Sequence, residues 1–435
     1  MKRISLTGMV AAFALVLAGC GGGDDDETGG EPRAGASLPN LAGQSIEVTA
    51  EWQKTEQQNF RRVLDEFERQ TGATVRYTST GSQTATILGT RVAGGNPPDV
   101  SLIPQPGLIR QFVSRGALKP LPQAVQDVVK DNFSEDWQDL GTFDDKLYAV
   151  WFKAANKSTI WYRPSAFEQA GVEPPGTWSD FVDSLQTLRD AGVTPLSVGG
   201  GDGWTLTDWF ENVYLSLAGA EKYDQLTNHE IPWTDPTVKE ALTLLGQAWK
   251  QEFLAPNAQQ TLFPDSVTQV FATNKAAQVF EGDFVAGVIG GSTKAKVGTD
   301  ARFYPFPKAG DAPSSVVGAG DAAVMFKSSP AAEAFMTFLA QPESADIWVR
   351  LGGFNSPNQK VDTANYPDDT SREIAEQLVE AEVFRFDMSD QTPSQFGGTP
   401  GRGEWKALQD FLANPSAVDQ AAARLESEAA KAYGG

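Results

Sequence analysis

The chain has 435 residues, of which 56 are acidic and 35 are basic, and its formal charge is −21 at pH 7. Such an acidic surface repels phosphate backbones, so we expect no nucleic-acid partner. The single histidine, His229, and the single cysteine, Cys20, cannot supply the usual Cys/His zinc cages or Cys-His catalysis. We therefore expect no metal, no cofactor and no enzymatic activity, and Ser-His-Asp chemistry would have to use His229.

The first twenty residues have the pattern of a secretory signal. Lys2 and Arg3 precede an apolar run, residues 9–17, that is too short for a permanent membrane helix. Leu17-Ala18-Gly19-Cys20 then resembles a bacterial lipobox, and this resemblance implies that Cys20 carries a lipid anchor. We expect residues 1–20 to be the lipoprotein signal peptide and the protein to lie outside the cytoplasm, held at the cell membrane.

Residues 21–43 consist mainly of Gly, Asp, Glu, Pro and Ala. So little of this stretch can be buried that it is expected to be a flexible tether. The rest of the chain exceeds one ordinary domain, which favours two lobes.

The first elements after the tether alternate between strand and helix patterns. Residues 46–50 read as a strand, and Thr55-Glu56-Gln57-Gln58 offers a capping box for a helix that Gly72 ends. Residues 74–78 and 100–103 read as further strands, residues 106–115 as a helix and residues 118–121 as a strand. Helices are also predicted over 177–191 and from Pro330 to about residue 340. The order predicts an α/β fold built around parallel sheets.

Several of these segments are similar to the solute-binding proteins of carbohydrate ABC importers, the maltose-binding type. The pieces that carry the resemblance are residues 67–72, 93–100, 167–172, 174–178 and 276–284. Residues 366–367, 384–385 and 387–390 look most like the alpha-glucoside-binding branch of that family.

The resemblance implies a two-lobed fold of the periplasmic-binding-protein kind, type II. Each lobe is then a mainly parallel sheet flanked by helices, and the ligand cleft lies at the hinge. We place lobe 1 at residues 44–155 and 305–340 and lobe 2 at residues 156–304 and 341–435. The chain is expected to cross between them near Ala155 and near residues 304–307.

A sugar has apolar faces and a rim of hydroxyls, so its pocket needs flat aromatic rings together with carboxylates and amides. Loops directly after strands have priority in an open α/β lobe. Trp52 and Glu56 follow the first strand, and Gln105 follows the third. Trp52 could instead cap the following helix, and Gln105 could belong to an ordinary turn.

The other candidate ligand residues come from later loops. Asn156 lies at the expected first crossing, and Gly320-Asp321 precedes a strand. Gly199-Gly200-Gly201-Asp202-Gly203-Trp204 and Thr207-Asp208-Trp209 combine glycines with Trp and Asp, although Trp209 could be helix core. Asp283-Phe284 matches the family segment whose last aromatic, usually Trp, stacks on the sugar. Phe354, Arg385, Asp387 and Trp405 are lesser candidates, for which loop packing is the preferred role.

Two glycine-rich segments imitate nucleotide loops. No lysine follows Gly199-Gly200-Gly201 as a phosphate loop requires, and the spacing around Gly290-Gly291-Ser292-Thr293-Lys294 is wrong. We therefore assign neither segment to phosphate.

These observations together predict a lipid-anchored protein that binds a sugar, such as an alpha-glucoside, and delivers it to the membrane subunits of an ABC importer. We expect it to act as a monomer. Two alternatives remain open. One is a secreted glycoside hydrolase that uses paired carboxylates, and the other is a lipoprotein sensor that reports ligand occupancy.

Overall fold

The computed structural model describes residues 38–434. The expected signal peptide, the lipid-bearing Cys20 and most of the expected tether lie outside the described residues. The end of that tether is ordered: Leu41 is buried and its N–H donates to the carbonyl of Thr71. An apolar side chain among polar neighbours is enough to dock this segment on the core.

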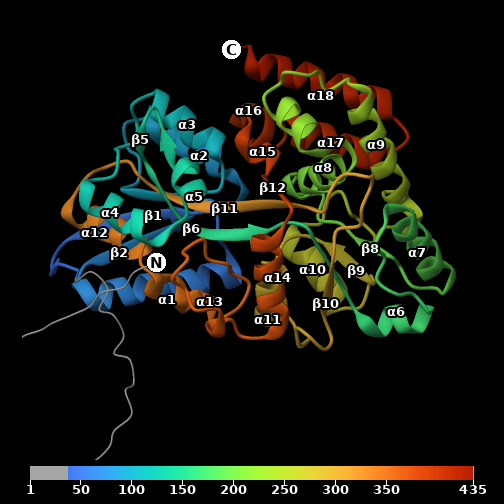
Figure 1. The fold of residues 1–435 in the computed structure, drawn as a ribbon, viewed down its shortest axis with the longest axis horizontal. Coiled ribbons are helices and arrows are strands. Elements are labelled where there is room, and N and C mark those ends of the chain that lie inside the picture. Colours follow the sequence, from blue (N-terminus) through green and yellow to red (C-terminus); the bar gives the residue numbers. More distant parts are fainter. Residues whose placement is uncertain (1–37, 435) are drawn as a thin grey trace, which may run out of the picture. The chain divides into compact units, whose positions relative to one another are not determined.

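A six-stranded mixed sheet forms the first half of the molecule (Figure 1). β1 pairs in parallel with β2 and β3, whereas β11 runs antiparallel to β3 and β6 and parallel to β12. The strands are β1 (Ser45–Ala50), β2 (Thr74–Ser79), β3 (Val100–Ile103), β6 (Ala149–Asn156), β11 (Ser315–Met325) and β12 (Val383–Phe386). We call this sheet, with the helices packed on it, the first half.

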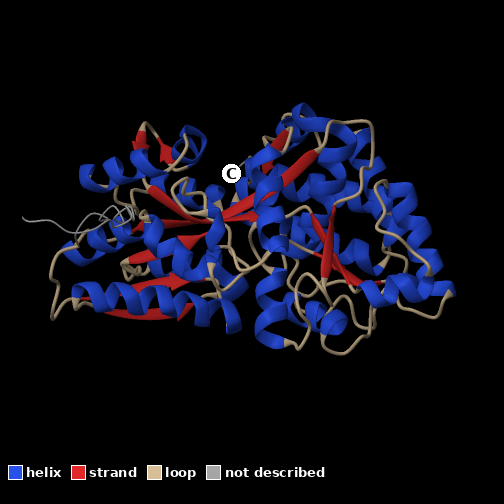
Figure 2. Cartoon of the chain, turned by 60° about the horizontal axis from the view of Figure 1, so that its bottom comes forward, coloured by secondary structure: helices blue, strands red, loops and turns tan. Residues whose placement is uncertain are grey.

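The helices of the first half cover both faces of its sheet (Figure 2). They are α1 (Lys54–Thr71), α2 (Thr84–Ala93), α3 (Pro106–Ser114), α4 (Gln123–Asn132), α5 (Glu135–Leu140), α12 (Pro330–Leu339) and α13 (Pro342–Val349). The short turn η1 (Gly81–Gln83) and the hairpin β4 (Thr142–Phe143) and β5 (Lys146–Leu147) belong to the same half, and η3 (Thr363–Asn365) follows α13. α1 shows why the sequence folds this way, because Phe60, Val63, Leu64 and Phe67 form its buried face and Gly72 ends it in the left-handed conformation.

A four-stranded sheet forms the second half, in the order β10 (Arg302–Pro305), β7 (Thr159–Tyr162), β9 (Gln278–Phe280), β8 (Leu196–Ser197). Its helices are α6 (Pro164–Ala170), α7 (Trp178–Asp190), α8 (Trp204–Thr227), α9 (Pro236–Ala248), α10 (Phe263–Phe271), α11 (Val285–Ser292), α14 (Asp369–Glu380), α15 (Met388–Gln391), α16 (Ser394–Gly397), α17 (Gly403–Ala413) and α18 (Val418–Tyr433), with the turn η2 (Gln251–Phe253). Of its pairings only β8–β9 is parallel, which differs from the mainly parallel sheet expected.

Local predictions hold where a buried face or a cap determines the element. α3, α7 and α12 lie where helices were predicted, and Ser329 caps α12 by accepting from Ala332 N. Two predictions were wrong. Residues 118–121 form no strand and make only an isolated bridge between Lys119 and Met325. α1 begins before Thr55, so the hydroxyl of that residue does not cap it.

The division into two lobes stays a prediction. Some residues assigned to lobe 2 pack against the first half. Residues 341–435 were placed in lobe 2. Trp348, Phe354 and Tyr366 nevertheless pack in the hydrophobic cluster of the first half. Trp348 lies 4.8 Å from Trp52, ring centroid to ring centroid. Among the described residues, no helix is long and apolar enough to span a bilayer.

If α13 belongs to the first half, Trp348→Ala should reduce the free energy of unfolding by about 3–5 kcal/mol, because it leaves a cavity in that core. Its effect should be non-additive with that of Trp52→Ala by about 0.5–1.5 kcal/mol, since the rings are in contact. Urea unfolding curves measure both quantities.

Leu351→Ala is the control, because Leu351 is 39% exposed just after α13. Its cost should stay within about 0.5 kcal/mol. Equal costs for both single variants, or strict additivity of the tryptophan pair, would contradict this packing.

Candidate functional site

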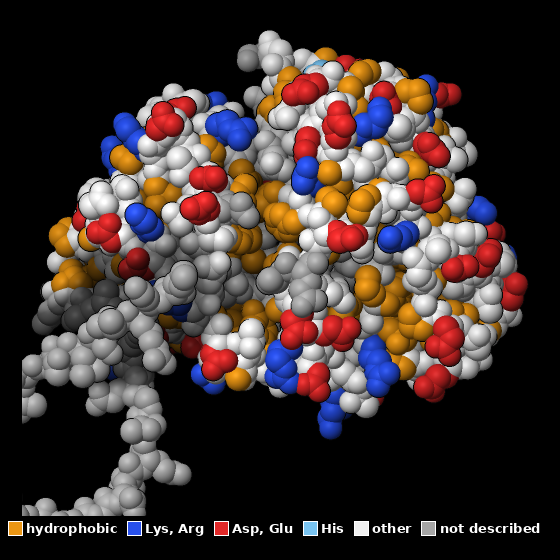
Figure 3. Space-filling model, viewed as in Figure 1, with side chains coloured by type: hydrophobic (Ala, Val, Ile, Leu, Met, Phe, Trp, Pro, Cys, Tyr) orange, Lys and Arg blue, Asp and Glu red, His pale blue; other side chains and the backbone are white. Residues whose placement is uncertain are grey.

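A cavity of about 100 Å³ lies where the two halves meet. The first half contributes loops that follow β1, β2 and β3, whereas the second half contributes the ends of α8, α10, α11 and α17. Its lining residues are Glu51, Glu56, Ser82, Thr84, Pro104, Gln105, Lys153, Ala155, Lys157, Trp204, Phe263, Phe284, Ala319, Gly320, Asp321, Ser389, Asp390, Gly398 and Trp405. On the face shown in Figure 3, acidic and basic side chains are interspersed at the periphery and hydrophobic side chains gather near the centre.

Strands β6 and β11 form one wall of the cavity. Successive side chains of a strand point to opposite faces, so Lys153 and Ala155 of β6 face the cavity together. Lys157, directly after the strand, lines the cavity on the same side. Across the ladder, Ala155 pairs with Ala319 and Lys153 pairs with Asp321. The wall therefore presents two ammonium groups and a carboxyl group.

Lys157 is held from behind the cavity by two fully buried carboxylates. Its Nζ donates to Asp387 Oδ2 at 2.5 Å and to Asp208 Oδ1 at 3.1 Å. Burial opposes the charge of Asp387, but Lys157 and the donors of Asp390 and Ser389 outweigh it and lower the pKa of Asp387. Burial would lower the pKa of Lys157, yet Asp208 and Asp387 raise it well above its ordinary value. The ammonium has three donors, so these two bonds leave one for a ligand.

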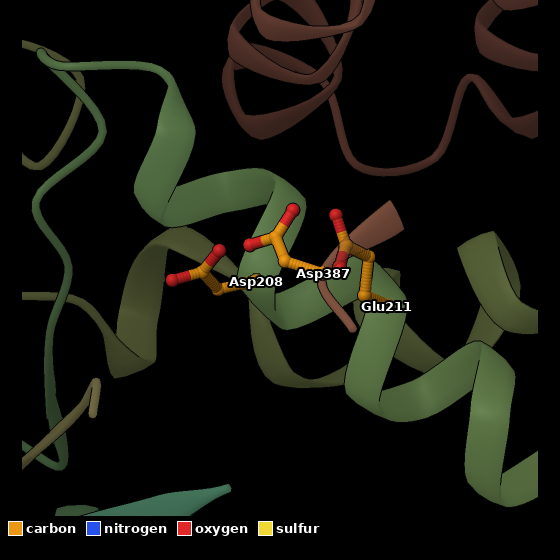
Figure 4. Close-up of side chains that lie close together, drawn as sticks. All are labelled: Asp208, Glu211 and Asp387. Atoms are coloured by element: carbon orange, nitrogen blue, oxygen red, sulfur yellow. The ribbon is translucent and has the colours of Figure 1, made fainter. Parts of the chain in front are cut away.

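Asp208, Glu211 and Asp387 are close enough together to bind a metal ion, with candidate oxygens within 4.8 Å of one another (Figure 4). All of their oxygens except Asp208 Oδ2 already accept hydrogen bonds. Glu211 accepts from the N–H groups of Met388 and Ser389 and from the Tyr223 hydroxyl. Since Lys157 bonds to the other two carboxylates, an ammonium supplies the cationic partner of this cluster.

Lys153 is the second buried cation of the wall. Its Nζ donates to Glu56 Oε1 at 2.8 Å and lies over the rings of Trp348, Phe284 and Trp52 at 5.2, 5.5 and 5.7 Å. Cation–π attraction of this kind stabilises a desolvated ammonium. Trp52 is 2% exposed, so the structure places it beneath Lys153 in the first-half core rather than at the cavity surface.

Three carboxyl groups of the cavity have raised pKa values. Burial, then the charge of Asp321, raises the pKa of Glu51 to about 8. Burial raises the pKa of Asp321 to about 6, although Lys153 opposes it, and burial with the charge of Asp387 raises that of Asp390 well above its ordinary range. Part of Glu51 is accessible to solvent, but protein atoms surround its carboxyl group. These groups hold protons that an exposed carboxylate would release.

Aromatic rings of the second half face this polar wall. The rings of Trp204, Phe263 and Phe284 pack against one another with centroids 5.2–6.0 Å apart. Trp405 of α17 adds a fourth ring beside the cavity. The cavity thus has an apolar aromatic side and a side of ammonium and carboxyl groups.

The structure brings six of the twelve predicted ligand residues to the cavity: Glu56, Gln105, Trp204, Phe284, Gly320 and Asp321. It places the other six beside or behind the walls: Trp52, Asn156, Asp202, Asp208, Trp209 and Asp283. Trp209 is 1% exposed and packs on Phe280 in the second-half core, which is the alternative that its helical position left open.

Asn156 and Asp283 connect backbone segments instead of facing the cavity. Asn156 lies on the opposite face of β6 from Lys157, and its N–H donates to Asp283 Oδ2 at 2.8 Å. Asp283 also accepts from the side chain of Asn355, which joins the loop after β9 to the loop after α13. Burial raises the pKa of Asp283 to about 6.

Asp202 joins two cavity walls without lining the cavity. Its Oδ2 accepts from Phe263 N at 2.6 Å and its Oδ1 accepts from Ser82 Oγ at 3.2 Å. The glycines around it leave no space for a side chain, since a Cβ on Gly201 would lie 2.9 Å from the Gln260 carbonyl oxygen. The glycine-rich loop therefore follows the protein's own backbone closely.

Sequence reasoning missed several lining residues, chiefly Glu51, Lys153, Lys157, Phe263 and Asp390. A signal for the lysines was present, because a period of two along Lys153 to Lys157 places both on one face and Asn156 on the other. Glu51 directly follows β1, where a strand-end residue is favoured. Of the lesser candidates, Trp405 lines the cavity, Asp387 holds Lys157, Phe354 is core and Arg385 bonds to Asp224.

The raised pKa values predict that stability falls as pH rises from 5 to 8. Burial holds the pKa of Glu51 at about 8 and of Asp283 and Asp321 at about 6, against ordinary values of 4.5 for Glu and 3.8 for Asp. Between the ordinary pKa and the raised pKa of each group, the folded chain binds more protons than the unfolded chain. The free energy of unfolding is therefore greatest below the ordinary pKa and falls as the pH rises through the raised pKa.

We expect a higher melting temperature at pH 5 than at pH 8, measured by calorimetry. Glu51→Gln, which cannot ionise, should flatten the fall between pH 7 and 8. A melting temperature that rises over this range would show that the carboxyl groups are ionised in the folded chain.

Comparisons with known proteins identify the family to which this sequence is similar. A model of the family described as bacterial extracellular solute-binding protein matches residues 51–346. The osmoprotective compounds-binding protein GgtB of Synechocystis is 33% identical over 82% of this chain and 86% of its own length. The alpha-glucosides-binding periplasmic protein AglE of Rhizobium meliloti is 32% identical over 88% of this chain and 86% of its own length.

Solved structures share the fold at lower identity. The bacterial solute receptor AcbH superposes with a TM-score of 0.78 and 18% identity, over 90% of this chain and 100% of its own. A chitin oligosaccharide binding protein gives 0.78 and 19%, over 90% and 99%. This chain is a member of the bacterial extracellular solute-binding protein family.

Proposed function

We propose that the chain binds a sugar in the cavity, an alpha-glucoside or another oligosaccharide, and delivers it to an ABC importer without changing it. The observation that carries the proposal is the pairing of opposite walls: aromatic rings on one side, ammonium and carboxyl groups on the other. A hydroxyl both donates and accepts hydrogen bonds, so neighbouring ammonium donors and carboxyl acceptors match a hydroxyl-rich rim. The rings match the apolar C–H faces of the same ligand.

The relatives support this assignment through what their names say they bind. AglE binds alpha-glucosides, and GgtB binds osmoprotective compounds. Both align over more than four fifths of this chain. A small polyhydroxylated solute is the ligand class that fits both names and the cavity lining.

Export and anchoring complete the proposal. A lipid on Cys20 would hold the chain at the outer side of the cell membrane, and residues beyond it would let the folded part reach the importer. We propose a monomer whose membrane partners are the importer subunits.

Simple binding is proposed in preference to glycoside hydrolysis. A hydrolase pairs a protonated carboxylic acid with a free carboxylate on the other side of the scissile bond. Glu56 in the cavity lining and Asp387 behind the wall each accept a hydrogen bond from a lysine ammonium, Lys153 and Lys157 respectively. These ion pairs oppose the attack of either carboxylate on a sugar.

Titration calorimetry against glucose, maltose, trehalose and sucrose is the test. We expect a glucoside to bind, and a concentration about 100 times its Kd should stabilise the folded chain by about 2.7 kcal/mol, seen as a raised melting temperature. Trp204→Ala should abolish the binding heat, because it removes the largest of the three mutually packed rings on the aromatic side.

Trp204→Phe should bind more weakly than the parent chain but detectably, and Leu262→Ala, at an exposed position beside Phe263, should bind normally. Chromatography of the incubated sugars should show no products. Product formation from any sugar, or unchanged binding by Trp204→Ala, would contradict the proposal.

A further inference from the structure

Helix α11 of the second half lies against the beginning of helix α1 of the first half, and its glycines allow that approach. A Cβ on Gly291 would lie 2.8 Å from the Cβ of Thr55, with Oγ1 and Cγ2 of Thr55 closer still. A Cβ is fixed to the backbone, so no change of rotamer relieves this overlap. The neighbouring Gly290 has nothing within 4 Å of such a position.

A second close approach lies along the same helix. A Cβ on Gly353, in the loop after α13, would lie 2.6 Å from the backbone nitrogen of Gly287. Gly353 also has a φ of +69°, which L side chains rarely adopt. We call the contacts of Gly287 with Gly353 and of Gly291 with Thr55 the glycine seam.

Polar contacts cross between the halves near the seam. Ser82 Oγ donates to Asp202 Oδ1 at 3.2 Å, and Asp202 also holds the backbone N–H of Phe263. The Lys54–Asp265 pair, at 3.7 Å, is exposed on both sides and contributes little. A single hydrogen bond of this kind can lengthen or exchange with water, whereas overlapping backbone-fixed atoms cannot, so the steric fit of the seam limits the approach of the halves more strictly.

The two helices that meet at the seam also carry opposite walls of the cavity. Glu56 follows Thr55 in the first turn of α1, and Phe284 directly precedes α11. Any separation of α1 from α11 therefore moves the carboxyl side of the cavity away from its aromatic side.

We propose that the glycine seam sets how far the two halves close over the ligand, and thereby how slowly the ligand leaves. The inference rests on the proposed function, in that the cavity holds the ligand. Closed interfaces are bistable rather than continuously deformable, so a wedge of one methyl group shifts the population toward the open state. Gly291 and Thr55 are positioning residues in this account, because neither lines the cavity.

The test compares Gly291→Ala with Gly290→Ala. Alanine favours helix over glycine at both positions, so any loss at Gly291 opposes the local gain in stability. Stopped-flow release of the sugar selected by calorimetry should be about tenfold faster in Gly291→Ala and unchanged in Gly290→Ala. Small-angle X-ray scattering should show a larger radius of gyration for Gly291→Ala with bound sugar.

Thr55→Gly combined with Gly291→Ala is the rescue variant, because it removes the atoms that the new methyl group meets. It should restore slow release and the smaller radius. A general folding defect would not be rescued in this way, and melting curves of each variant detect such a defect independently.

The results separate this proposal from the proposed function. The seam proposal is wrong if Gly291→Ala releases the sugar at the parent rate, or if adding Thr55→Gly does not restore slow release. Neither result would contradict the proposal that the chain binds a sugar. If the parent chain binds no sugar, the proposed function fails. The radii of gyration of the ligand-free variants then test the seam proposal. It predicts a larger radius for Gly291→Ala and an unchanged radius for Gly290→Ala.

Discussion

The burial of the Lys157 charge is the constraint on which the site depends. An ammonium removed from water is tolerated only where carboxylates and further donors compensate it, and removing one partner of such a group costs several kcal/mol. Here Asp208 comes from α8, Asp387 directly follows β12 and Lys157 directly follows β6. One ion-pair cluster thus fixes three separate chain segments and leaves one donor of Lys157 without a carboxylate partner at the cavity.

Much of the fold follows from local patterns. The apolar spacing of α1, its Gly72 cap and the Ser329-Pro330 start of α12 are visible in the sequence because each depends on residues within one or two turns. The antiparallel pairings of β7 and the packing of Trp348 on Trp52 depend on partners far along the chain. No local periodicity reports such partners, so the antiparallel pairings of the second sheet were not predicted. The lobe boundary after residue 340 stays a prediction.

The candidate site was predictable only in part, and for a related reason. Trp204 and Phe284 lie in the segments after β8 and β9, where ligand residues are expected. Asp202 and Asp283 share that position, but the structure turns their carboxylates toward backbone N–H groups. Gly320 and Asp321 were expected before a strand, but they lie within β11, whose bounds depend on its pairing with β6. Lys153 and Lys157 were passed over because lysine is seldom buried, and their burial is acceptable only beside carboxylates that lie elsewhere in the sequence. Family resemblance supplied the ligand class that composition alone could not.

A crystal structure of the chain with the sugar chosen by calorimetry tests the central claim most directly. The account predicts one sugar unit between the Trp204 ring and the β6–β11 wall, with a sugar oxygen within hydrogen-bond reach of Lys157 Nζ while Asp208 and Asp387 keep their bonds to it. A sugar bound elsewhere, or a Lys157 side chain released from both carboxylates in the complex, would contradict it.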